Sequence, residues 1–183
     1  MRSKHALNEA GYPAESSTGA ALYTPDQRRR RDASPWTLVQ GILAPVQFLI
    51  FLVSLVLVLR FLSTGEGWYA ATVSIVVKTL ALYTIMITGS IWEKEVFGRY
   101  LFAPAFYWED IVSMFVLALH TAYLGTLIFS WGTPRQQMLL ALAAYATYAV
   151  NAAQFVWKLR MARLQSSQLS PADNNAASME LAR

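Results

Sequence analysis

Four long apolar segments, separated by short polar stretches, occupy most of the chain. They cover residues 36–59, 68–91, 109–131 and 135–158. A helix that crosses the hydrocarbon core of a bilayer needs about 20 mostly apolar residues, because each residue adds about 1.5 Å of length. Helices are favoured because lipid offers no partner to an unpaired backbone group. The sequence therefore predicts an all-α integral membrane protein, a bundle of about four transmembrane helices.

Charge is scarce between residues 36 and 158. The chain is 14% charged, whereas soluble domains carry about 25% charged residues. This middle region has six Lys or Arg and five Asp or Glu, so nine basic and six acidic residues lie outside it. The net charge of +4 therefore argues for membrane orientation rather than for nucleic-acid binding. The absence of cysteine excludes disulfides, thiolate metal sites and thiol catalysis within this chain.

The two ends of the chain differ in composition from the apolar middle. Residues 1–33 are polar and rich in Ala, Gly and Ser, and residues 164–183 are polar again. We expect both segments to be disordered. Residues 34–163 then form the four-helix transmembrane domain, which begins at Ser34 and Pro35, a typical cap and first residue of a helix.

The distribution of Lys and Arg predicts the orientation of the bundle. If there are four spans, most basic residues share one side of the membrane: Arg28–Arg31, Lys94, Arg99, Lys158, Arg160 and Arg163. The other side holds Arg60 and Arg135. The positive-inside rule then predicts that both termini and residues 92–108 are cytoplasmic.

Four carboxyl groups gather near one predicted membrane boundary, in the segment IWEKEVFGRYLFAPAFYWED (residues 91–110). Glu109 and Asp110 have a structural explanation, because acidic side chains in the first turn of a helix interact favourably with its dipole. Glu93 and Glu95 have no equally good explanation. Burial or mutual repulsion can keep one carboxyl protonated, so that it serves as an acid beside a basic neighbour. Helical spacing does not determine whether Glu93 meets Glu109.

Two ionisable residues lie near the middle of predicted spans, where such groups are costly and usually face the bundle interior. An ammonium at Lys78 needs a counter-charge or a route to water. It is either part of a structural ion pair, a contact for a substrate carboxylate, or a proton-transfer group. Histidine is the side chain that titrates near neutral pH without help and it can ligate metals, so His120 is a candidate for a functional role. The alternative for His120 is a packed, hydrogen-bonded structural residue.

Two further sets of polar residues recur along single helical faces. The first span carries three of them at intervals of seven: Gln40, Gln47 and Ser54. The fourth span carries four on one face: Thr147, Asn151, Gln154 and Lys158. Hydrogen bonding between helices is the default interpretation of both sets. The first set is alternatively one wall of a pocket.

Several long segments together resemble one enzyme family. They are LYTPDQRRRRDASPWTLVQGILAPVQFLIFLVS, SIVVKTLALYTIMITGSIWEKEVFGRYLFAPAFYWED, LALHTAY and LAAYATYAVNAAQFVWKLR, within residues 22–164. This whole pattern is similar to the 3-vinyl (in older naming, 2-vinyl) bacteriochlorophyllide hydratases, which are integral membrane enzymes of bacteriochlorophyll synthesis. The resemblance implies a hydro-lyase that adds water to the ring A vinyl group of a magnesium chlorin, chlorophyllide a or a relative, giving a 1-hydroxyethyl group. It also implies location in a bacterial inner membrane, cytoplasmic or intracytoplasmic.

The implied reaction needs an acid and a base but no redox cofactor. Magnesium arrives with the substrate, and the chain has no P-loop or dinucleotide fingerprint. An acid must protonate the terminal vinyl carbon, and a base must direct water to the inner carbon. We expect this work from a subset of five residues: Glu93, Glu95, Glu109, Asp110 and His120.

The pigment also needs polar contacts for its propionate and its magnesium. We expect Lys78 or Arg99 to bind the propionate. His120 is a candidate axial ligand to magnesium, and Gln47 and Asn151 are weaker candidates. The two roles of His120 compete, because one imidazole is not expected both to hold magnesium and to transfer the proton.

Two alternatives to a hydratase remain open from the sequence. One is a non-catalytic pigment-binding or assembly protein, in which His120 ligates magnesium and the carboxyl groups are structural. The other is a small carrier subunit, in which Lys78 and the carboxyl groups form a proton path. Expected partners are a chlorophyllide-type pigment and the lipid bilayer, and no nucleic acid. Association with a second copy or with other pigment-synthesis enzymes also remains open.

Overall fold

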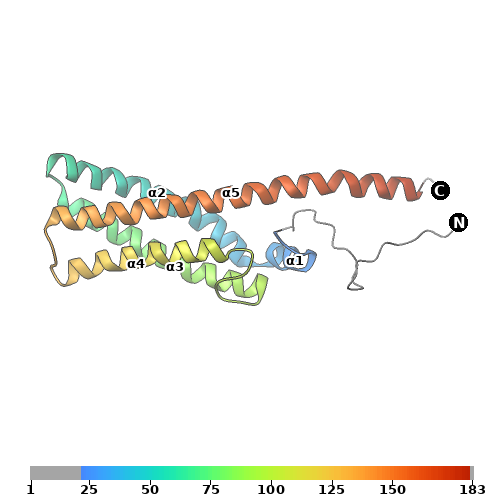
Figure 1. Cartoon of the computed structure of the whole chain (residues 1–183), viewed down its shortest axis with the longest axis horizontal. Helices are drawn as coiled ribbons and strands as arrows, with labels where there is room; N and C mark the ends of the chain where they lie inside the picture. The colour runs from blue at the N-terminus through green and yellow to red at the C-terminus, as the bar shows by residue number, and fades with distance from the viewer. Residues whose placement is uncertain (1–21, 182–183) are drawn as a thin grey trace, which may run out of the picture.

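The computed structural model describes the backbone of residues 22–181 and the side chains of residues 22–161. The chain is all-helical over this range (Figure 1). The helices are α1 (Pro25–Ala33), α2 (Pro35–Thr64), α3 (Trp68–Phe97), α4 (Tyr107–Ile128) and α5 (Pro134–Leu181). Four of them, α2 to α5, contain a segment long and apolar enough to cross a membrane. The four predicted spans are therefore confirmed as helices.

Short polar signals set the helix ends. The Ser34 hydroxyl accepts a hydrogen bond from the backbone N–H of Trp36 and caps α2. Gly65 and Gly67 adopt left-handed backbone angles, with φ of 76° and 84°, in the tight turn from α2 to α3. Residues that carry a side chain rarely adopt these backbone angles, so glycine makes this turn possible. Thr133 caps α5, where its hydroxyl accepts from the N–H of Gln136.

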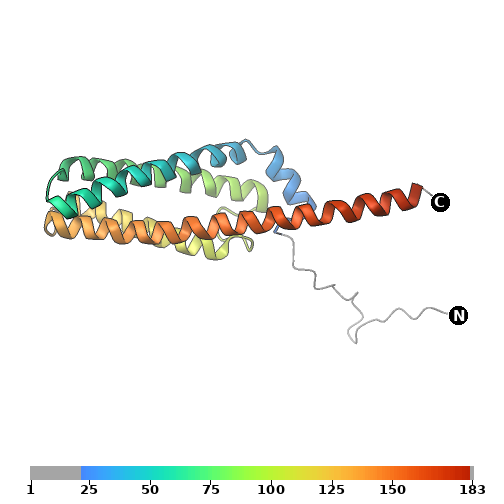
Figure 2. The ribbon, with the colours of Figure 1, turned by 90° about the horizontal axis from the view of Figure 1, so that it is seen from above.

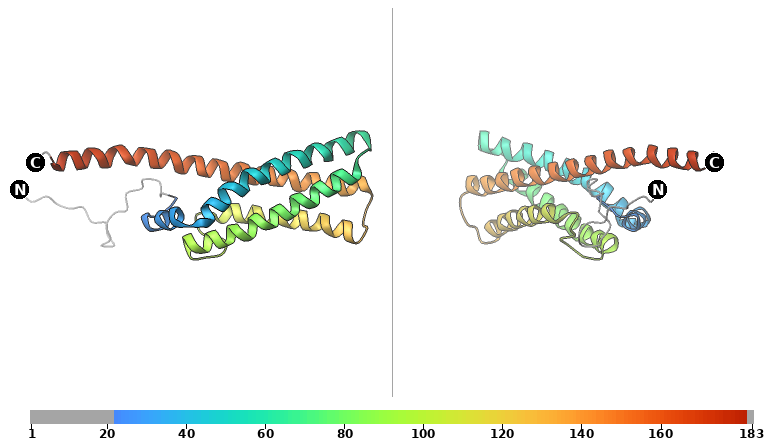
Figure 3. Two further views of the ribbon diagram at one scale, coloured as in Figure 1. Left: turned by 180° about the vertical axis from the view of Figure 1, so that it is seen from behind. Right: turned by 45° about the vertical axis from the view of Figure 1, so that its right-hand side comes forward.

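The helices form an up-and-down bundle with two different ends. α2 packs mainly against α3, α4 packs mainly against α5, and α5 also contacts α2. The α2–α3 and α4–α5 turns lie at one end, and α1 and the α3–α4 loop lie at the other (Figures 1 and 2). α5 extends well beyond this second end (Figure 3). Antiparallel neighbours with short connections are the expected topology for a bundle of this kind.

The predicted N-terminal disorder is corrected for part of its range. Residues 1–21 lie outside the described residues, but residues 25–33 form α1. Thr24 and Gln27 make a capping box, in which each side chain accepts a hydrogen bond from the backbone N–H of the other, at 3.3 and 2.9 Å. A Thr–Gln pair at this spacing is a typical sequence signal for a helix start. The high polarity of the segment nevertheless favoured the prediction of disorder.

The predicted C-terminal disorder also differs from the described backbone. α5 does not end near residue 163 but continues as a helix to Leu181. Residues 164–181 contain no glycine and no Val, Ile or Thr. Pro171 and the weak helix formers Asp173, Asn174 and Asn175 work against a helix here, so composition alone does not explain the continuation of α5.

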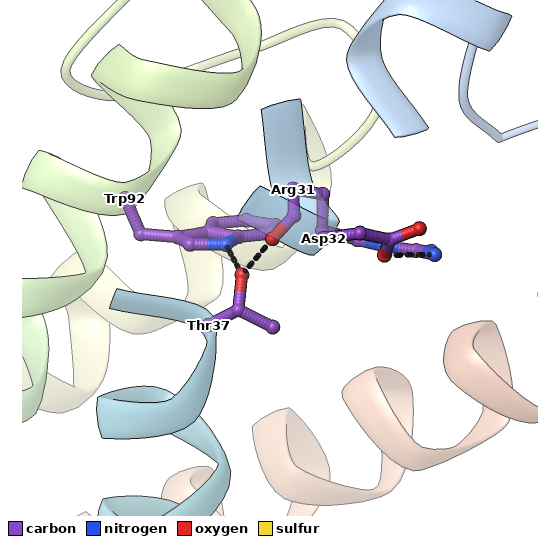
Figure 4. Close-up of polar contacts among 4 residues, drawn as sticks. All are labelled: Arg31, Asp32, Thr37 and Trp92. Carbon is purple, nitrogen blue, oxygen red and sulfur yellow. Dashed lines mark hydrogen bonds and ion pairs between the residues drawn. The ribbon is translucent and has the colours of Figure 1, made fainter. Parts of the chain in front are cut away.

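α1 is fastened to the start of α2 and the end of α3. The indole N–H of Trp92 donates to the Thr37 hydroxyl at 2.9 Å, and that hydroxyl donates to the backbone carbonyl of Arg31 at 2.5 Å (Figure 4). Arg31 also pairs with Asp32 at 2.7 Å. Tyr23 is buried in an aromatic cluster, and this burial raises the pKa of its phenol. The end of the bundle that carries the α3–α4 loop is thus a packed structure.

Candidate active site at the membrane boundary

The α3–α4 loop, residues 98–106, carries two residues with left-handed backbone angles. Gly98 ends α3 with a φ of 81°. Phe102 has a φ of 58°, which is uncommon for any residue other than glycine. Such a conformation persists only where surrounding contacts hold it. The contacts that hold Phe102 come from the carboxyl groups of the flanking helices.

Glu93 of α3 and Asp110 of α4 hold this loop from two sides. The backbone N–H of Phe102 donates to Asp110 Oδ2 at 2.7 Å, and the next N–H, that of Ala103, donates to Glu93 Oε2 at 3.3 Å. Because these two N–H groups belong to consecutive residues, the carboxyl groups of Glu93 and Asp110 are close neighbours. Both residues are buried, with 6% and 3% of their surface exposed. Two carboxyl groups from different helices therefore meet beneath the loop.

Glu93 and Asp110 are buried carboxyl groups that lie close together. Two such groups repel each other when both are ionised, so this kind of arrangement favours one proton held by the pair. A pair of carboxyl groups with one proton is a known arrangement for acid–base work, because one member can donate while the other accepts. The sequence placed both residues in the acid–base set, and the structure brings them to the same loop.

Glu109 lies next to this pair, and we call Glu93, Glu109 and Asp110 the carboxyl cluster. Glu109 is the member of the cluster that lines a groove. Its Oε2 lies 2.6 Å from Lys158 Nζ of α5. The same ammonium lies 4.9 Å from the centre of the Phe106 ring. Glu109 and Lys158 together line a groove on the surface of α4 and α5, with a volume of about 640 Å³. Lys158 is therefore a partner of the cluster, although its sequence position indicated only packing between helices.

Glu95 and Arg99 lie apart from the buried pair. Glu95 is exposed and accepts a hydrogen bond from the Ser34 hydroxyl, which joins α3 to the start of α2. Arg99 is exposed just after α3. Within the described residues, neither side chain forms a hydrogen bond or ion pair with Glu93 or Asp110. Glu93 and Glu95 therefore face different surroundings although only one residue separates them.

His120 and Lys78 lie in the bundle interior, away from the carboxyl groups. His120 Nδ1 lies 2.8 Å from the backbone carbonyl of Val116, so Nδ1 carries the hydrogen, and Nε2 has no hydrogen-bond partner among the described residues. Lys78 Nζ also has none there and lies 3.7 Å from the centre of the Tyr148 ring. At 1.5 Å per residue, His120 is about 15 Å along α4 from Asp110. The structure does not bring these residues together with the carboxyl cluster.

The remaining predicted polar residues mostly join helices. Gln40 donates to Thr88 at 2.7 Å, and the Asn151 amide donates to Ser113 at 2.8 Å. Gln47 is buried, and its Nε2 has no hydrogen-bond partner within the part of the chain that the structure describes. Bonding between helices, the default interpretation, is thus confirmed for Gln40 and Asn151. No cluster of three or more His, Cys, Asp or Glu able to hold a metal ion occurs among the described residues.

The backbone amides of Phe102 and Ala103 were missed by sequence reasoning. Residue type carries no signal for them, because every residue other than proline has a backbone N–H. The only available hint was the position of these residues between two acidic pairs. Their role depends on the loop conformation, which brings two consecutive N–H groups to two carboxyl groups.

Comparison with known proteins gives a consistent result. The family described as 2-vinyl bacteriochlorophyllide hydratase matches residues 23–161 of this chain. A curated 2-vinyl bacteriochlorophyllide hydratase of Rhodobacter capsulatus is 69% identical over 147 residues, covering 80% of this chain and 85% of that protein. The protein of the same name from Cereibacter sphaeroides is 68% identical over 143 residues, covering 78% and 89%. No solved structure matches the chain.

Proposed function

The chain belongs to the 2-vinyl bacteriochlorophyllide hydratase family and is a hydro-lyase of bacteriochlorophyll synthesis, and we propose that it hydrates a magnesium chlorin. The substrate is chlorophyllide a or a closely related bacteriochlorophyllide. Water adds across the ring A vinyl group, and the product carries a 1-hydroxyethyl group in its place. The family match over residues 23–161 is the observation that carries this proposal.

The reaction is a protonation followed by capture of water. An acid gives its proton to the terminal vinyl carbon, and positive charge develops on the inner carbon, where the macrocycle delocalises it. The oxygen of one water then bonds to the inner carbon, and a base takes the proton that this water loses. The acid and base return to their starting states, with one water consumed. No electrons are gained or lost, so no redox cofactor is required, and magnesium enters as part of the substrate.

We assign the proton transfers to the Glu93–Asp110 pair and to Glu109. The pair holds one proton, so it can supply the proton that the vinyl group needs and later take back the one that water loses. Glu109 follows Asp110 directly in the chain and lines the groove. It is therefore the carboxyl group nearest to a bound pigment, and it acts between the pigment and the buried pair.

The other candidate residues have supporting roles in this proposal. Glu95 fastens α3 to Ser34 at the start of α2. Arg99 is exposed beside the loop and remains available to an anionic group of the pigment. His120 Nε2, Gln47 and Asn151 remain candidates for binding magnesium, and Lys78 for binding a carboxylate, if a pigment enters the interior.

The proposed orientation follows from the asymmetry of the two ends. Lys94 and Arg99 lie at the end that also carries α1 with Arg28–Arg31, whereas Arg60 lies near the opposite end. The positive-inside rule then makes the first end cytoplasmic, together with both termini. The membrane is the bacterial inner membrane or its intracytoplasmic extension. Association with a second copy or with other enzymes of pigment synthesis is compatible with this placement.

The test is incubation of membranes that contain this chain with chlorophyllide a, followed by mass and absorption analysis of the pigment. The expected product is heavier by one water, and its red absorption band is shifted to the blue because one conjugated double bond is lost. Membranes without the chain serve as the control. Pigment recovered unchanged from membranes with folded protein would refute the proposal, whereas tight retention of unchanged pigment would identify a non-catalytic pigment-binding protein.

A further inference from the structure

One face of α5 points away from the bundle and carries an apolar strip with polar groups beside it. The residues of α5 that line the groove recur every three or four positions, so they share one side of the helix. They are Val150, Ala153, Gln154, Trp157, Lys158 and Met161, and Glu109 of α4 completes the lining. Ala153 provides a shallow floor, because its side chain is small. Trp157 is 73% exposed and Val150 is 57% exposed, so the bundle leaves most of their apolar surface uncovered.

The polar side chains of the groove are few, and two of them are paired with each other. Lys158 Nζ lies 2.6 Å from Glu109 Oε2, and the side chains are 24% and 11% exposed. The Gln154 Oε1 atom is buried without a hydrogen-bond partner among the described residues. An apolar surface with a small number of placed polar groups is typical of ligand sites. The volume of about 640 Å³ also falls within the usual range for such sites, roughly 300–1,000 Å³.

A second groove on the same molecule lacks these polar groups. It lies between α2 and α3, is lined by Leu49, Ile50, Val53, Ser74 and Val77, and has a volume of about 310 Å³. Its lining contains no charged side chain that could bind a carboxylate. A flat apolar molecule with one carboxylate is therefore better matched by the α4–α5 groove, which combines an apolar strip with an ammonium.

We propose that the chlorin substrate binds in the α4–α5 groove, with its macrocycle against Ala153 and Trp157 and its carboxylate on Lys158. This inference rests on the proposed function, because that function supplies the ligand. The groove faces lipid, so a substrate dissolved in the bilayer reaches it without crossing water. Trp157 offers an aromatic edge or face to the macrocycle, and aromatic contacts of this kind stabilise a complex beyond burial alone.

Binding of the substrate carboxylate to Lys158 also changes the role of Glu109 in the reaction. When Lys158 turns to the substrate carboxylate, Glu109 loses the counter-charge that holds it in the ion pair. It is then free to exchange a proton with its neighbour Asp110, which lies beside Glu93 beneath the loop. In this step one carboxyl O–H bond breaks and another forms, so the proton stays within the three carboxyl groups. Arrival of the substrate thus releases the carboxyl group that acts on it.

The experiment compares two exposed tryptophans at the same end of the bundle. Trp157 lines the groove, whereas Trp108 does not and is exposed to a similar extent, 70% against 73%. Trp157→Leu is expected to raise the KM for chlorophyllide a about fivefold, in line with the loss of an aromatic contact. Trp108→Leu is expected to change KM by less than about twofold. Equal effects of the two substitutions would overturn the placement.

A second measurement tests the carboxylate contact and does not depend on the amount of folded protein. Each variant is given chlorophyllide a as the free acid and as its methyl ester, and the ratio of kcat/KM for the two is determined. The wild type is expected to prefer the free acid by about tenfold or more, as for loss of a charge-assisted hydrogen bond. Lys158→Met is expected to abolish the preference, and Lys158→Arg to keep it.

The outcomes separate this inference from the proposed function. Hydration of chlorophyllide a by the wild type supports the function whatever the variants do. If the wild type hydrates the pigment and Lys158→Met still prefers the free acid, the groove is not the binding site and only this inference fails. If the wild type produces no hydrated pigment, the proposed function fails first.

Discussion

The two polar regions of this bundle differ in how completely their side chains are paired. At the membrane boundary, Glu93, Glu109 and Asp110 all have partners, in loop amides or in Lys158. In the interior, Lys78 Nζ and His120 Nε2 have no hydrogen-bond partner among the described residues. A paired cluster holds its groups in fixed positions, whereas unpaired buried groups lower stability. We therefore expect substitutions to affect chiefly the reaction at the boundary and chiefly stability in the interior.

The largest expected effect is that of Asp110→Asn. The amide carbonyl can still accept the N–H of Phe102, so the loop remains held, but the group no longer exchanges a proton. Hydration of chlorophyllide a is expected to slow by about 100-fold or more, the usual contribution of a general acid or base. Glu93→Gln is expected to slow hydration to a similar extent. Glu66→Gln serves as the control, because Glu66 lies in the exposed turn at the opposite end of the bundle. Full activity of both Asp110→Asn and Glu93→Gln would remove the pair from the mechanism.

Lys78→Met tests the interior side of the comparison. An ammonium taken out of water without a counter-charge costs several kcal/mol. Its contact with the Tyr148 ring returns about 2 kcal/mol, only part of this cost. The free energy of unfolding in detergent is therefore expected to rise by about 1–2 kcal/mol. Lys94→Met, at an exposed position, is the control and is expected to change it by less than about 0.5 kcal/mol. A clear loss of stability in Lys78→Met would mean that the amine has a stabilising partner.

Phe102 tests whether the carboxyl groups hold the loop against a backbone preference. Phe102→Ile and Phe102→Asn both remove the aromatic ring, but asparagine tolerates a left-handed backbone and a β-branched residue does not. The isoleucine variant is expected to be less stable than the asparagine variant by about 1–2 kcal/mol in thermal unfolding. Equal stabilities would show that the loop relaxes to other backbone angles. The contacts of Glu93 and Asp110 with the loop would then not hold Phe102 in its left-handed conformation.

The smallest expected effect concerns a buried hydroxyl network in the interior. The Tyr145 hydroxyl lies 2.5 Å from that of Ser54, which lies 2.7 Å from Ser74. Tyr145→Phe is expected to lower the free energy of unfolding by about 1 kcal/mol. Tyr83→Phe, which removes a bond to Thr121 at a more exposed position, is expected to have a smaller effect. A larger loss in Tyr83→Phe would contradict the idea that burial sets the value of these bonds.

Prediction from sequence succeeded where the signal was long or local. Segments of 20 or more apolar residues predicted the spans, and Ser34, Thr133 and the Gly65–Gly67 turn marked helix ends that the structure confirms. It was less successful where a polar segment is helical. Residues 25–33 and 164–181 are polar and were predicted to be disordered, although the Thr24–Gln27 capping box marks a helix start and α5 continues to Leu181.

The amino-acid sequence by itself determined the membrane character, the four spans, the family and the set of carboxyl groups near one boundary. These properties depend on residue type and on spacing along one helix, which the sequence contains directly. Only the tertiary structure decided that Glu93 meets Asp110, that Glu109 pairs with Lys158, and that His120 lies apart from them. Contacts between helices depend on how each helix is rotated and on the path of the α3–α4 loop. Two residues as close as Glu93 and Glu95 can therefore have different surroundings.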